Sequence, residues 1–224
     1  MKCDKITLGD IMRLRNVKNK KEILEASSYL IKFPEEHIGK WKRLFGNNNP
    51  IYIEIGMGKG KFIIENALAN PNINFIGIEK FDSVLAKCLP KIPSELKNLL
   101  IIRMDALNID KVFSGEIDRI YLNFSDPWPK ARHHLRRLSS EVFLDKYESL
   151  FTNNCEIYQR TDNQDLYIYS LMSYSRKGYV LSDITFDLHE DKEELITTEY
   201  EDRFSNKGMP IYAVVATKNL HRDK

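Results

Sequence analysis

Length, composition and charge place the chain among globular proteins with a single core. It has 224 residues, of which 42% are hydrophobic, and its 34 Lys and Arg against 32 Asp and Glu leave a formal net charge of +2. That hydrophobic content is enough to bury a core and excludes a wholly disordered protein. Because the total charge is nearly balanced, a basic surface for nucleic acid has to come from local clustering.

Neither a membrane span nor a disulfide framework is predicted. No apolar run approaches the roughly 18 residues that a bilayer-crossing helix needs, and the opening MKCDKITLGD lacks the apolar core of a signal peptide. Cys3, Cys88 and Cys155 are far apart and form no C-x-x-C pair, so we interpret them as reduced thiols and not as zinc ligands. We therefore expect a cytoplasmic protein without membrane contact.

Residues 1–49 are the least regular part of the sequence. The stretch RLRNVKNKK, residues 13–21, carries five fixed positive charges and no acid, and a helix is expected around His37 to Phe45. We interpret residues 1–49 as an N-terminal basic arm and helix that lead into a main domain covering residues 50–224.

From residue 50 onward, strand-like and helix-like segments alternate. Short β-branched and aromatic runs predict strands at 51–55, 74–78, 99–104, 117–124 and 155–160. Segments with helical spacing lie at 61–69, 83–91, 139–151 and 164–176, with Ser139 or Ser140 as the N-cap of the third. Two further strands near 179–186 and 211–217 have no clear helix between them, which favours an antiparallel, hairpin-like edge. The alternation predicts a mostly parallel α/β sheet.

The first predicted strand runs into a glycine-rich turn, EIGMGKG, residues 54–60. Glycines at alternate positions let the backbone turn sharply and approach a ligand without Cβ atoms in the way. The turn lies at the carboxyl end of a strand, where doubly wound sheets bind their ligands. A dinucleotide fingerprint requires a third glycine where Lys61 stands, so the spacing disfavours NAD and favours a cofactor without a pyrophosphate.

Carboxylates stand at the ends of three predicted strands. Glu79 ends the second strand and is suited to accept hydrogen bonds from the two hydroxyls of a ribose. Asp105 follows the third strand, where it is suited to an adenine amino group, and Glu54 adds an acid next to the glycine turn. Each acid alone is more often a solvated surface charge. Together, at one edge of the sheet, they favour a cationic adenosyl cofactor, S-adenosylmethionine.

A stiff loop with two prolines follows the fourth strand, in NFSDPWPK, residues 123–130. Proline restricts its own φ and favours an extended conformation at the preceding residue. The loop is therefore able to fix a carboxylate, Asp126, and an aromatic ring, Trp128, in one geometry. The indole offers a face on which a nucleobase can stack. The alternative is a rigid structural turn with a packed Trp.

Basic residues then follow with no acid before Glu141, namely Lys130, Arg132, His133, His134, Arg136 and Arg137. In isolation such a run is a solvated face, but next to a candidate active site it is interpreted as a phosphate-binding cluster. The histidines have no third ligand at useful spacing, so no metal is expected. Asp162 and Glu201 are suited either to the Watson–Crick edge of a guanine or to roles as caps and surface charges.

Together these motifs resemble those of the bacterial tRNA (guanine-N7)-methyltransferases, a family of the class I S-adenosylmethionine-dependent fold. The resemblance covers nearly the whole chain and rests on MRLRN (12–16), EIGMGKGKFI (54–63), GIE (77–79), FSDPWPKARHHLRRL (124–138), RTDN (160–163) and TEYEDRF (198–204). It implies a Rossmann-like α/β fold with a seven-stranded, mostly parallel sheet, an antiparallel last strand and helices on both faces. It also implies methyl transfer from S-adenosylmethionine to N7 of a guanine in the variable loop of tRNA, position 46 in tRNA numbering.

The same resemblance assigns roles to particular residues. It implies that the cofactor binds Glu54, Gly56, Glu79, Asp105 and Asp126, that the substrate binds Lys130, Asp162, Thr198, Glu199, Tyr200 and Glu201, and that the RNA faces Arg132, His133, His134, Leu135, Arg136 and Arg137. Two departures are visible. Leu135 stands where the family often has a basic residue, and eleven residues precede the MRLRN opening, so Met12 is an alternative start. We expect tRNA as the partner, no metal, and a monomer or homodimer.

Guanine N7 carries a lone pair and no proton, so methyl transfer to it needs no general base. We expect Asp126 to orient the reactants and to stabilise positive charge on the purine. Two other classes of protein share parts of the pattern: a nucleotide-dependent oxidoreductase, which Lys61 disfavours, and a non-catalytic RNA-binding protein. Within methyltransferases, Trp128 and Pro129 stand where enzymes for exocyclic amines carry Pro followed by Tyr or Phe.

Overall fold

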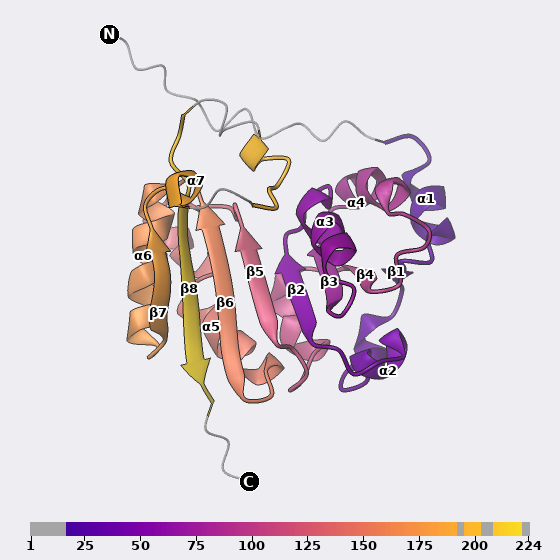
Figure 1. Ribbon diagram of the computed structural model, residues 1–224, viewed down its shortest axis with the longest axis horizontal. Helices are drawn as coiled ribbons and strands as arrows, with labels where there is room; N and C mark the ends of the chain where they lie inside the picture. Colours follow the sequence, from indigo (N-terminus) through magenta and orange to yellow (C-terminus); the bar gives the residue numbers. More distant parts are fainter. Residues whose placement is uncertain (1–16, 192–194, 203–207, 221–224) are drawn as a thin grey trace.

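The computed structural model describes residues 17–191, 195–202 and 208–220 and contains one eight-stranded sheet (Figure 1). The spatial order of the strands is β1-β4-β3-β2-β5-β6-β8-β7. Their bounds are β1 Leu30–Ile31, β2 Ile51–Ile55, β3 Asn74–Glu79, β4 Leu99–Arg103, β5 Arg119–Asn123, β6 Asn154–Thr161, β7 Val180–Thr185 and β8 Tyr212–Asn219. β8 runs antiparallel to β6 and β7, and the other neighbouring pairs are parallel.

Seven of these strands are the ones that the sequence predicts. The antiparallel edge is confirmed, because β8 inserts between β6 and β7 and pairs with both. The additional strand is β1 at the opposite edge, where Leu30 pairs with Ile101 and Ile31 with Ile102. A strand of two residues has no alternating pattern to detect, which is why the sequence indicates seven strands and the structure has one more.

Helices join most of the strands. The α-helices are α1 Lys20–Ala26, α2 Trp41–Phe45, α3 Lys61–Ala69, α4 Asp82–Cys88, α5 Glu141–Leu150, α6 Gln164–Arg176 and α7 Leu188–Asp191, and the 3₁₀ turns are η2 Pro34–His37, η3 Leu89–Lys91, η4 Ala106–Lys111 and η5 Ala131–Arg136. The four helices predicted after residue 50 correspond to α3, α4 with η3, α5 and α6. None of the helices in the described ranges is long and apolar enough to cross a membrane.

The helix predicted around His37 to Phe45 is interrupted in the structure. η2 ends at His37, and α2 begins only at Trp41. Between them Gly39 has a φ of +70°, in the left-handed region that interrupts a right-handed helix. Glu116 stabilises the break by accepting hydrogen bonds from the N–H of Gly39 at 2.8 Å and of Trp41 at 3.2 Å. This carboxylate is distant in sequence, so local spacing does not reveal the break.

α5 begins at Glu141 as the sequence predicts, but the serines before it do not cap it with their side chains. Ser140 occupies the N-cap position without a side-chain hydrogen bond to the helix, and its Oγ donates instead to the carbonyl of Leu135 at 3.0 Å. The Oγ of Ser139 lies 2.6 Å from the Oγ of Ser170 in α6. The two serines therefore tie the start of α5 to the preceding turn and to α6.

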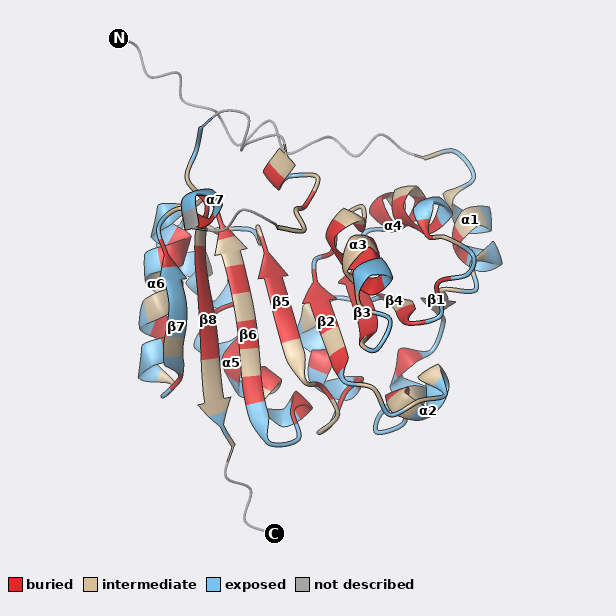
Figure 2. Ribbon diagram, viewed as in Figure 1, coloured by how far each residue is buried: buried red, intermediate tan, exposed pale blue. Residues whose placement is uncertain are grey.

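An apolar layer covers each face of the sheet, and the central strands are largely buried (Figure 2). On one face, Ile53 and Ile120 belong to a cluster that includes side chains of α5 and α6. On the other face, Phe75 belongs to a cluster that includes side chains of α1, α3 and α4. The prediction of helices on both faces is therefore confirmed.

The described part of residues 1–49 packs against the rest of the chain. α1 contacts α4, β1 joins the sheet, and Trp41 of α2 is fully buried, with its indole N–H donating to the carbonyl of Val112 at 2.9 Å. Residues 1–16, which contain the MRLRN motif, lie outside the described residues. The division into residues 1–49 and 50–224 stays a prediction, but residues 20–45 pack as part of the same body as the sheet.

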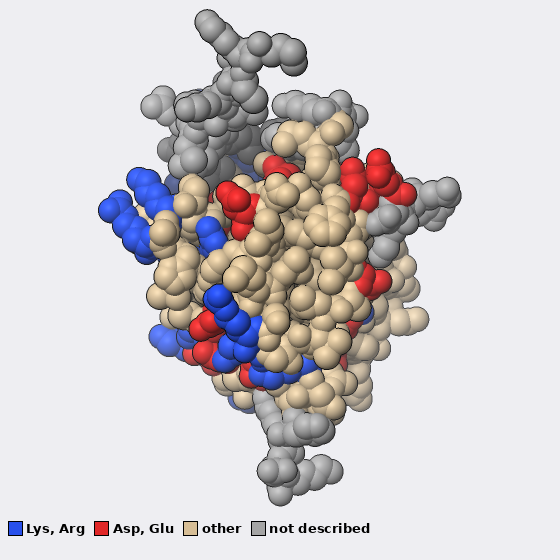
Figure 3. Space-filling view, turned by 90° about the vertical axis from the view of Figure 1, so that its left-hand side faces the viewer, with Lys and Arg blue, Asp and Glu red and all other residues tan. Residues whose placement is uncertain are grey.

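The β7 edge presents apolar side chains to solvent. Val180 is 68% exposed, Ile184 47% and Phe186 63%. Ile168 and Met172 on the neighbouring α6 are exposed as well. Figure 3 views this side of the molecule and shows a broad area without Lys, Arg, Asp or Glu. The expectation of a monomer or homodimer stays a prediction.

Candidate active site

Two neighbouring cavities open at the carboxyl ends of the central strands. Their volumes are about 480 Å³ and about 250 Å³, and Gly56, Glu79 and Phe124 line both of them. The larger cavity is also lined by Asp105, Asp126, Trp128 and Arg136, and the smaller one by Glu54, Asn123, Thr198, Glu199 and Tyr200. The structure thus brings together most of the residues that the resemblance assigns to cofactor and substrate.

The glycine turn after β2 leaves open space beside the cavities. Gly56 and Gly58 have φ values of +78° and +59°, and a Cβ added to either would meet nothing within 4 Å. By contrast, a Cβ at Gly60 would lie 2.5 Å from the Sγ of Cys88, so this glycine serves the packing of α3 against α4. Of the three glycines, the first two leave room for a ligand to approach the backbone.

Glu79 and Asp105 are oriented by hydrogen bonds to nearby backbone. Glu79 is 8% exposed, and its Oε1 accepts from the N–H of Lys80 at 2.8 Å and of Phe81 at 3.0 Å. Burial raises the pKa of Glu79 above its ordinary value. Asp105 is exposed and is the N-cap of η4, where its Oδ1 accepts from the N–H of Leu107 at 3.0 Å. These bonds fix both carboxylates on the wall of the larger cavity.

Glu54 and Asn123 form a buried polar pair at the ends of β2 and β5. They are 1% and 7% exposed, and Nδ2 of Asn123 donates to Oε1 of Glu54 at 2.9 Å. Burial raises the pKa of Glu54 to about 7; Glu199 and Glu79 add to the rise, whereas Asn123 and Arg160 oppose it. Asn123 is a site residue that the sequence analysis misses. The available signal is a polar residue that closes an otherwise apolar strand.

The loop after β5 is bent by two bulky residues in the left-handed region. Phe124 has a φ of +50° and Trp128 a φ of +42°, conformations that persist only where the surroundings enforce them. Arg137 supplies part of that enforcement, since its Nε donates to the carbonyl of Pro127 at 2.9 Å and its Nη2 to that of Trp128 at 3.3 Å. Asp126 lies exposed within this fixed loop, on the wall of the larger cavity.

The basic residues after the loop do not act alike. Arg136 is exposed, lines the larger cavity and lies with its guanidinium 5.0 Å from the centre of the Trp128 ring. Arg137 is half-buried, and its guanidinium lies 4.3 Å from the centre of the Tyr169 ring. It donates to carbonyls of the loop, whereas the sequence analysis predicts that it contacts a phosphate. The ring of His133 meets Trp128 edge-on at 5.8 Å. Exposed residues outside the cavity wall are Lys130, Arg132, His134 and Leu135.

No metal centre accompanies these histidines in the described part of the chain. There, no group of three or more His, Cys, Asp or Glu side chains is placed to hold a metal ion. The Nδ1 of His134 lies 2.7 Å from the carbonyl oxygen of Ala131, which is a bond within η5. The two histidines therefore belong to the turn that follows the loop.

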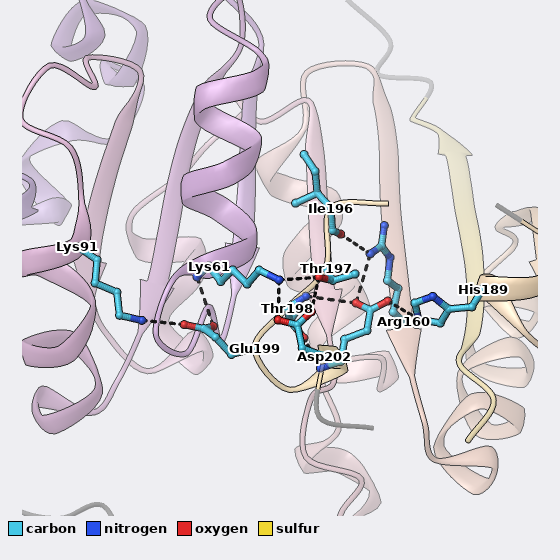
Figure 4. A network of polar contacts seen from close by, with 10 residues as sticks. Lys61, Lys91, Arg160, His189, Ile196, Thr197, Thr198, Glu199 and Asp202 are labelled. Carbon is cyan, nitrogen blue, oxygen red and sulfur yellow. Dashed lines mark hydrogen bonds and ion pairs between the residues drawn. The ribbon is translucent and has the colours of Figure 1, made fainter. Parts of the chain in front are cut away.

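Residues 195–202, which we call the strap, contribute Thr198, Glu199 and Tyr200 to the wall of the smaller cavity. Figure 4 shows polar contacts that hold the strap. Within the strap, Thr198 and Glu201 bond reciprocally: the N–H of Glu201 donates to Thr198 Oγ1 at 2.9 Å, and the N–H of Thr198 donates to Glu201 Oε2 at 3.3 Å. This is a capping box at the start of a helical turn. Glu201 is fully buried, 3.6 Å from Arg160 and 3.0 Å from His189. Its carboxylate thus anchors the strap and lines neither cavity. Of the two roles that the sequence analysis gives Glu201, this position matches the cap and not the guanine contact.

Two lysines connect the strap to the opposite side of the site. The Nζ of Lys61 in α3 donates to Thr197 Oγ1 at 2.7 Å and lies 2.6 Å from Asp202 Oδ2 (Figure 4). The Nζ of Lys91 in η3 pairs with Glu199 Oε1 at 2.9 Å. These contacts set Glu199 on the wall of the smaller cavity, next to the glycine turn.

Asp162 and Tyr200 form a polar pair across the site. The hydroxyl of Tyr200 donates to Asp162 Oδ2 at 3.0 Å, and its ring lies 5.1 Å from that of Phe124. Burial and the neighbouring Asp162 carboxylate raise the pKa of Tyr200 above its ordinary value. Asp162 therefore reaches the smaller cavity through Tyr200.

Comparison with known proteins gives a consistent assignment. A family model described as "Putative methyltransferase" matches residues 48–214. A tRNA (guanine-N(7)-)-methyltransferase of Lachnoclostridium phytofermentans is 50% identical over 209 residues, which cover 92% of this chain and 98% of that relative. Another, of a Geobacillus species, is 53% identical over 205 residues, covering 90% and 93%. The chain belongs to the tRNA (guanine-N7)-methyltransferase family.

Solved structures with the same architecture have low sequence identity and show the fold alone. An antibiotic-related methyltransferase superposes with a TM-score of 0.61 at 17% identity and covers 81% of this chain and 94% of its own. The 16S rRNA methyltransferase KamB superposes with a TM-score of 0.60 at 14% identity and covers 81% and 93%. The Rossmann-like methyltransferase fold is therefore confirmed.

S-adenosylmethionine is the methyl donor that this family and fold imply, and the residues present fit it. The open space at Gly56 and Gly58 admits a ligand close to the backbone. Glu79 and Asp105 on the cavity wall are acceptors suited to ribose hydroxyls and an adenine amino group. Oε2 of Glu54 is buried and has no hydrogen-bond partner among the described residues, which matches a ligand that carries donors and positive charge.

Replacing Glu201 with glutamine is expected to loosen the strap of this methyltransferase. Glutamine keeps the shape but removes the charge that faces Arg160 and His189, so the free energy of unfolding should fall by about 1–3 kcal/mol, as measured by urea denaturation. Glu199→Gln is the control, because its side chain is 29% exposed and a surface ion pair contributes less than about 1 kcal/mol. Equal losses in the two variants would contradict the anchoring role.

Proposed function

We propose that this chain transfers the methyl group of S-adenosylmethionine to N7 of the guanine at position 46, in the variable loop of cytoplasmic tRNA. The observation that carries the proposal is that residues suited to the base and residues suited to the methyl donor line one cavity. Asp126 and Trp128, suited to a purine, line the same cavity as Glu79 and Asp105, suited to an adenosyl group. Donor and base would therefore meet in one space. The curated relatives, about half identical to this chain, bear the name of this activity.

The chemistry asks little of the protein beyond binding and orientation. Bound S-adenosylmethionine supplies a methyl group on a positively charged sulfur. Because guanine N7 has a lone pair and no proton, no side chain has to act as a base. Holding two reactants in line contributes roughly 7–11 kcal/mol to lowering the barrier. The purine gains positive charge in the transition state, and the carboxylate of Asp126 on the cavity wall stabilises that charge.

The substrate guanine would be held by an aromatic ring and by acceptors. Stacking on Trp128 contributes about 1–3 kcal/mol. Glu199 on the wall of the smaller cavity and the Asp162–Tyr200 pair are the acidic groups suited to the Watson–Crick edge, because the carboxylate of Glu201 is buried against Arg160. Exposed Arg136 at the cavity mouth is placed to contact the phosphate backbone.

The two neighbouring arginines should respond differently to removal. Arg136→Ala is expected to raise the KM for tRNA and to reduce the slope of its logarithm against log salt by about 0.7–0.9, the amount for one phosphate contact. Arg137→Ala is expected to lower Tm and kcat, because the carbonyls of Pro127 and Trp128 lose their donors, and to leave the salt slope unchanged. KM measured at several salt concentrations separates the two. Identical salt slopes for both variants would contradict this division.

Incubation with methyl-labelled S-adenosylmethionine and an unmodified tRNA transcript tests the function. Digestion to nucleosides should yield labelled N7-methylguanosine, and a transcript with adenine in place of guanine 46 should yield none. Label in another guanosine would contradict the position. RNA binding without any label would support the alternative of a non-catalytic RNA-binding protein.

A further inference from the structure

Glu54 and Asn123 present two hydrogen-bond acceptors that the described residues leave unfilled. Both side chains are more than nine-tenths buried, line the smaller cavity and are bonded to each other through Asn123 Nδ2 and Glu54 Oε1. Glu54 Oε2 and Asn123 Oδ1 have no hydrogen-bond partner. These two oxygens belong to side chains that are bonded to each other and that line the same cavity. A buried acceptor without a partner destabilises a fold, so the pair indicates a ligand with at least two donors.

An ammonium group has the matching chemistry. It carries three N–H donors and a positive charge, and its bonds to an ionised acceptor are strong in a site shielded from water. The amino-acid part of S-adenosylmethionine contains one such group. We propose that Asn123 is a positioning residue for the methyl donor: its amide fixes one carboxylate oxygen of Glu54 and leaves the other, with its own carbonyl oxygen, to receive the donor's ammonium. This inference rests on the proposed function, which supplies the donor.

The surrounding charges make this subsite sensitive to pH. The charged groups that face Glu54 or share its cavity are Glu79 of β3, Arg160 of β6, Glu199 of the strap, Lys59 of the glycine turn and Lys87 of α4. Burial raises the pKa of Glu54 to about 7 in the protein without ligand. An ammonium bound at Oε2 favours the ionised carboxylate, so below that pH binding releases a proton. The affinity should therefore fall towards acid, by up to about tenfold per pH unit.

Calorimetric titration with two ligands tests the subsite on the unmodified protein. S-adenosylhomocysteine keeps the ammonium group and lacks the transferable methyl, and its desamino form lacks the ammonium. At pH 7.5 the desamino ligand should bind about 10- to 100-fold more weakly. Between pH 8 and pH 6 the affinity for S-adenosylhomocysteine should fall about tenfold, whereas that for the desamino ligand should stay constant. Titrations in buffers with different protonation enthalpies report the released proton directly.

Asn123→Ala then tests the positioning role. The variant should shrink the affinity ratio of the two ligands, and the midpoint of the pH dependence should move upward, because the bond from Asn123 lowers the pKa of Glu54. Asn123→Asp, which keeps the shape, should move the midpoint in the same direction. Asn98→Ala is the matched control: Asn98 is a buried asparagine whose Nδ2 donates to three main-chain carbonyls, the shortest bond being 2.8 Å to Ile73. Its loss should lower stability without changing the ratio or the midpoint.

The outcomes separate this inference from the proposed function. Equal affinities for the two ligands, or the same pH dependence for both, would overturn the ammonium subsite even if binding were tight. A ratio and midpoint unchanged in Asn123→Ala would overturn the role of Asn123. Binding of neither ligand would contradict the proposed function itself, and with it the donor.

Discussion

Asp126→Asn is expected to lower kcat for tRNA methylation by about 100-fold, a loss typical of removing one group that stabilises transition-state charge. Asparagine keeps the size of the side chain and its place in the loop, but it removes the negative charge that, in the proposed function, faces the purine as the purine becomes cationic. Asp126 is exposed and forms no part of the apolar core, so the fold should be unaffected. Single-turnover rates with both substrates saturating measure the effect without a contribution from product release.

A surface carboxylate provides the control for this experiment. Asp165→Asn in α6 removes an exposed acid of the same kind away from both cavities and should leave the rate within twofold of the unmodified protein. Full turnover by Asp126→Asn would contradict the electrostatic role. A rate that rises tenfold per pH unit, and loses that dependence in the variant, would show instead that Asp126 accepts a proton.

The location of the site follows from the sequence because it depends on topology. Gly56, Glu79, Asp105 and Asp126 each stand just after, or at the end of, a predicted strand, and parallel strands place their carboxyl ends at one edge of a sheet. No knowledge of side-chain contacts is needed for that step. The alternation of strands and helices is enough to predict that these residues share one edge of the sheet. The structure has all four on the wall of one cavity.

The direction in which each side chain points does not follow from the sequence in the same way. In TEYE, Glu199 and Glu201 are two residues apart and chemically identical, yet one lines a cavity and the other is fully buried. The choice depends on Arg160 of β6 and His189 of α7, which meet Glu201 only in the folded chain. The orientation of Arg137 is equally hard to predict. It donates to carbonyl oxygens of a loop whose bend is not indicated by any pattern in the sequence.

Glu79→Gln is expected to weaken binding of S-adenosylhomocysteine by about 100-fold, the amount for losing hydrogen bonds to a charged acceptor. Lys80 and Phe81 hold one oxygen of Glu79 with their backbone N–H groups. Glutamine is able to satisfy these donors with its amide oxygen, but its NH₂ group then stands where the ribose hydroxyls need an acceptor. Calorimetric titration measures the loss, and Glu141→Gln, an exposed acid at the start of α5, should bind as the unmodified protein does.

The thermal stability of Glu79→Gln shows whether the variant loses binding alone or also loses its fold. Burial raises the pKa of Glu79, so the folded state binds a proton more readily than the unfolded state does. As pH rises above the ordinary glutamate pKa, the ionised carboxylate therefore destabilises the fold, and glutamine removes that effect. The Tm of Glu79→Gln in the absence of ligand should equal or exceed that of the unmodified protein at pH 8, and the difference should shrink towards pH 4. A variant that loses binding and also unfolds at lower temperature at pH 8 would show that Glu79 supports the structure and not the ribose.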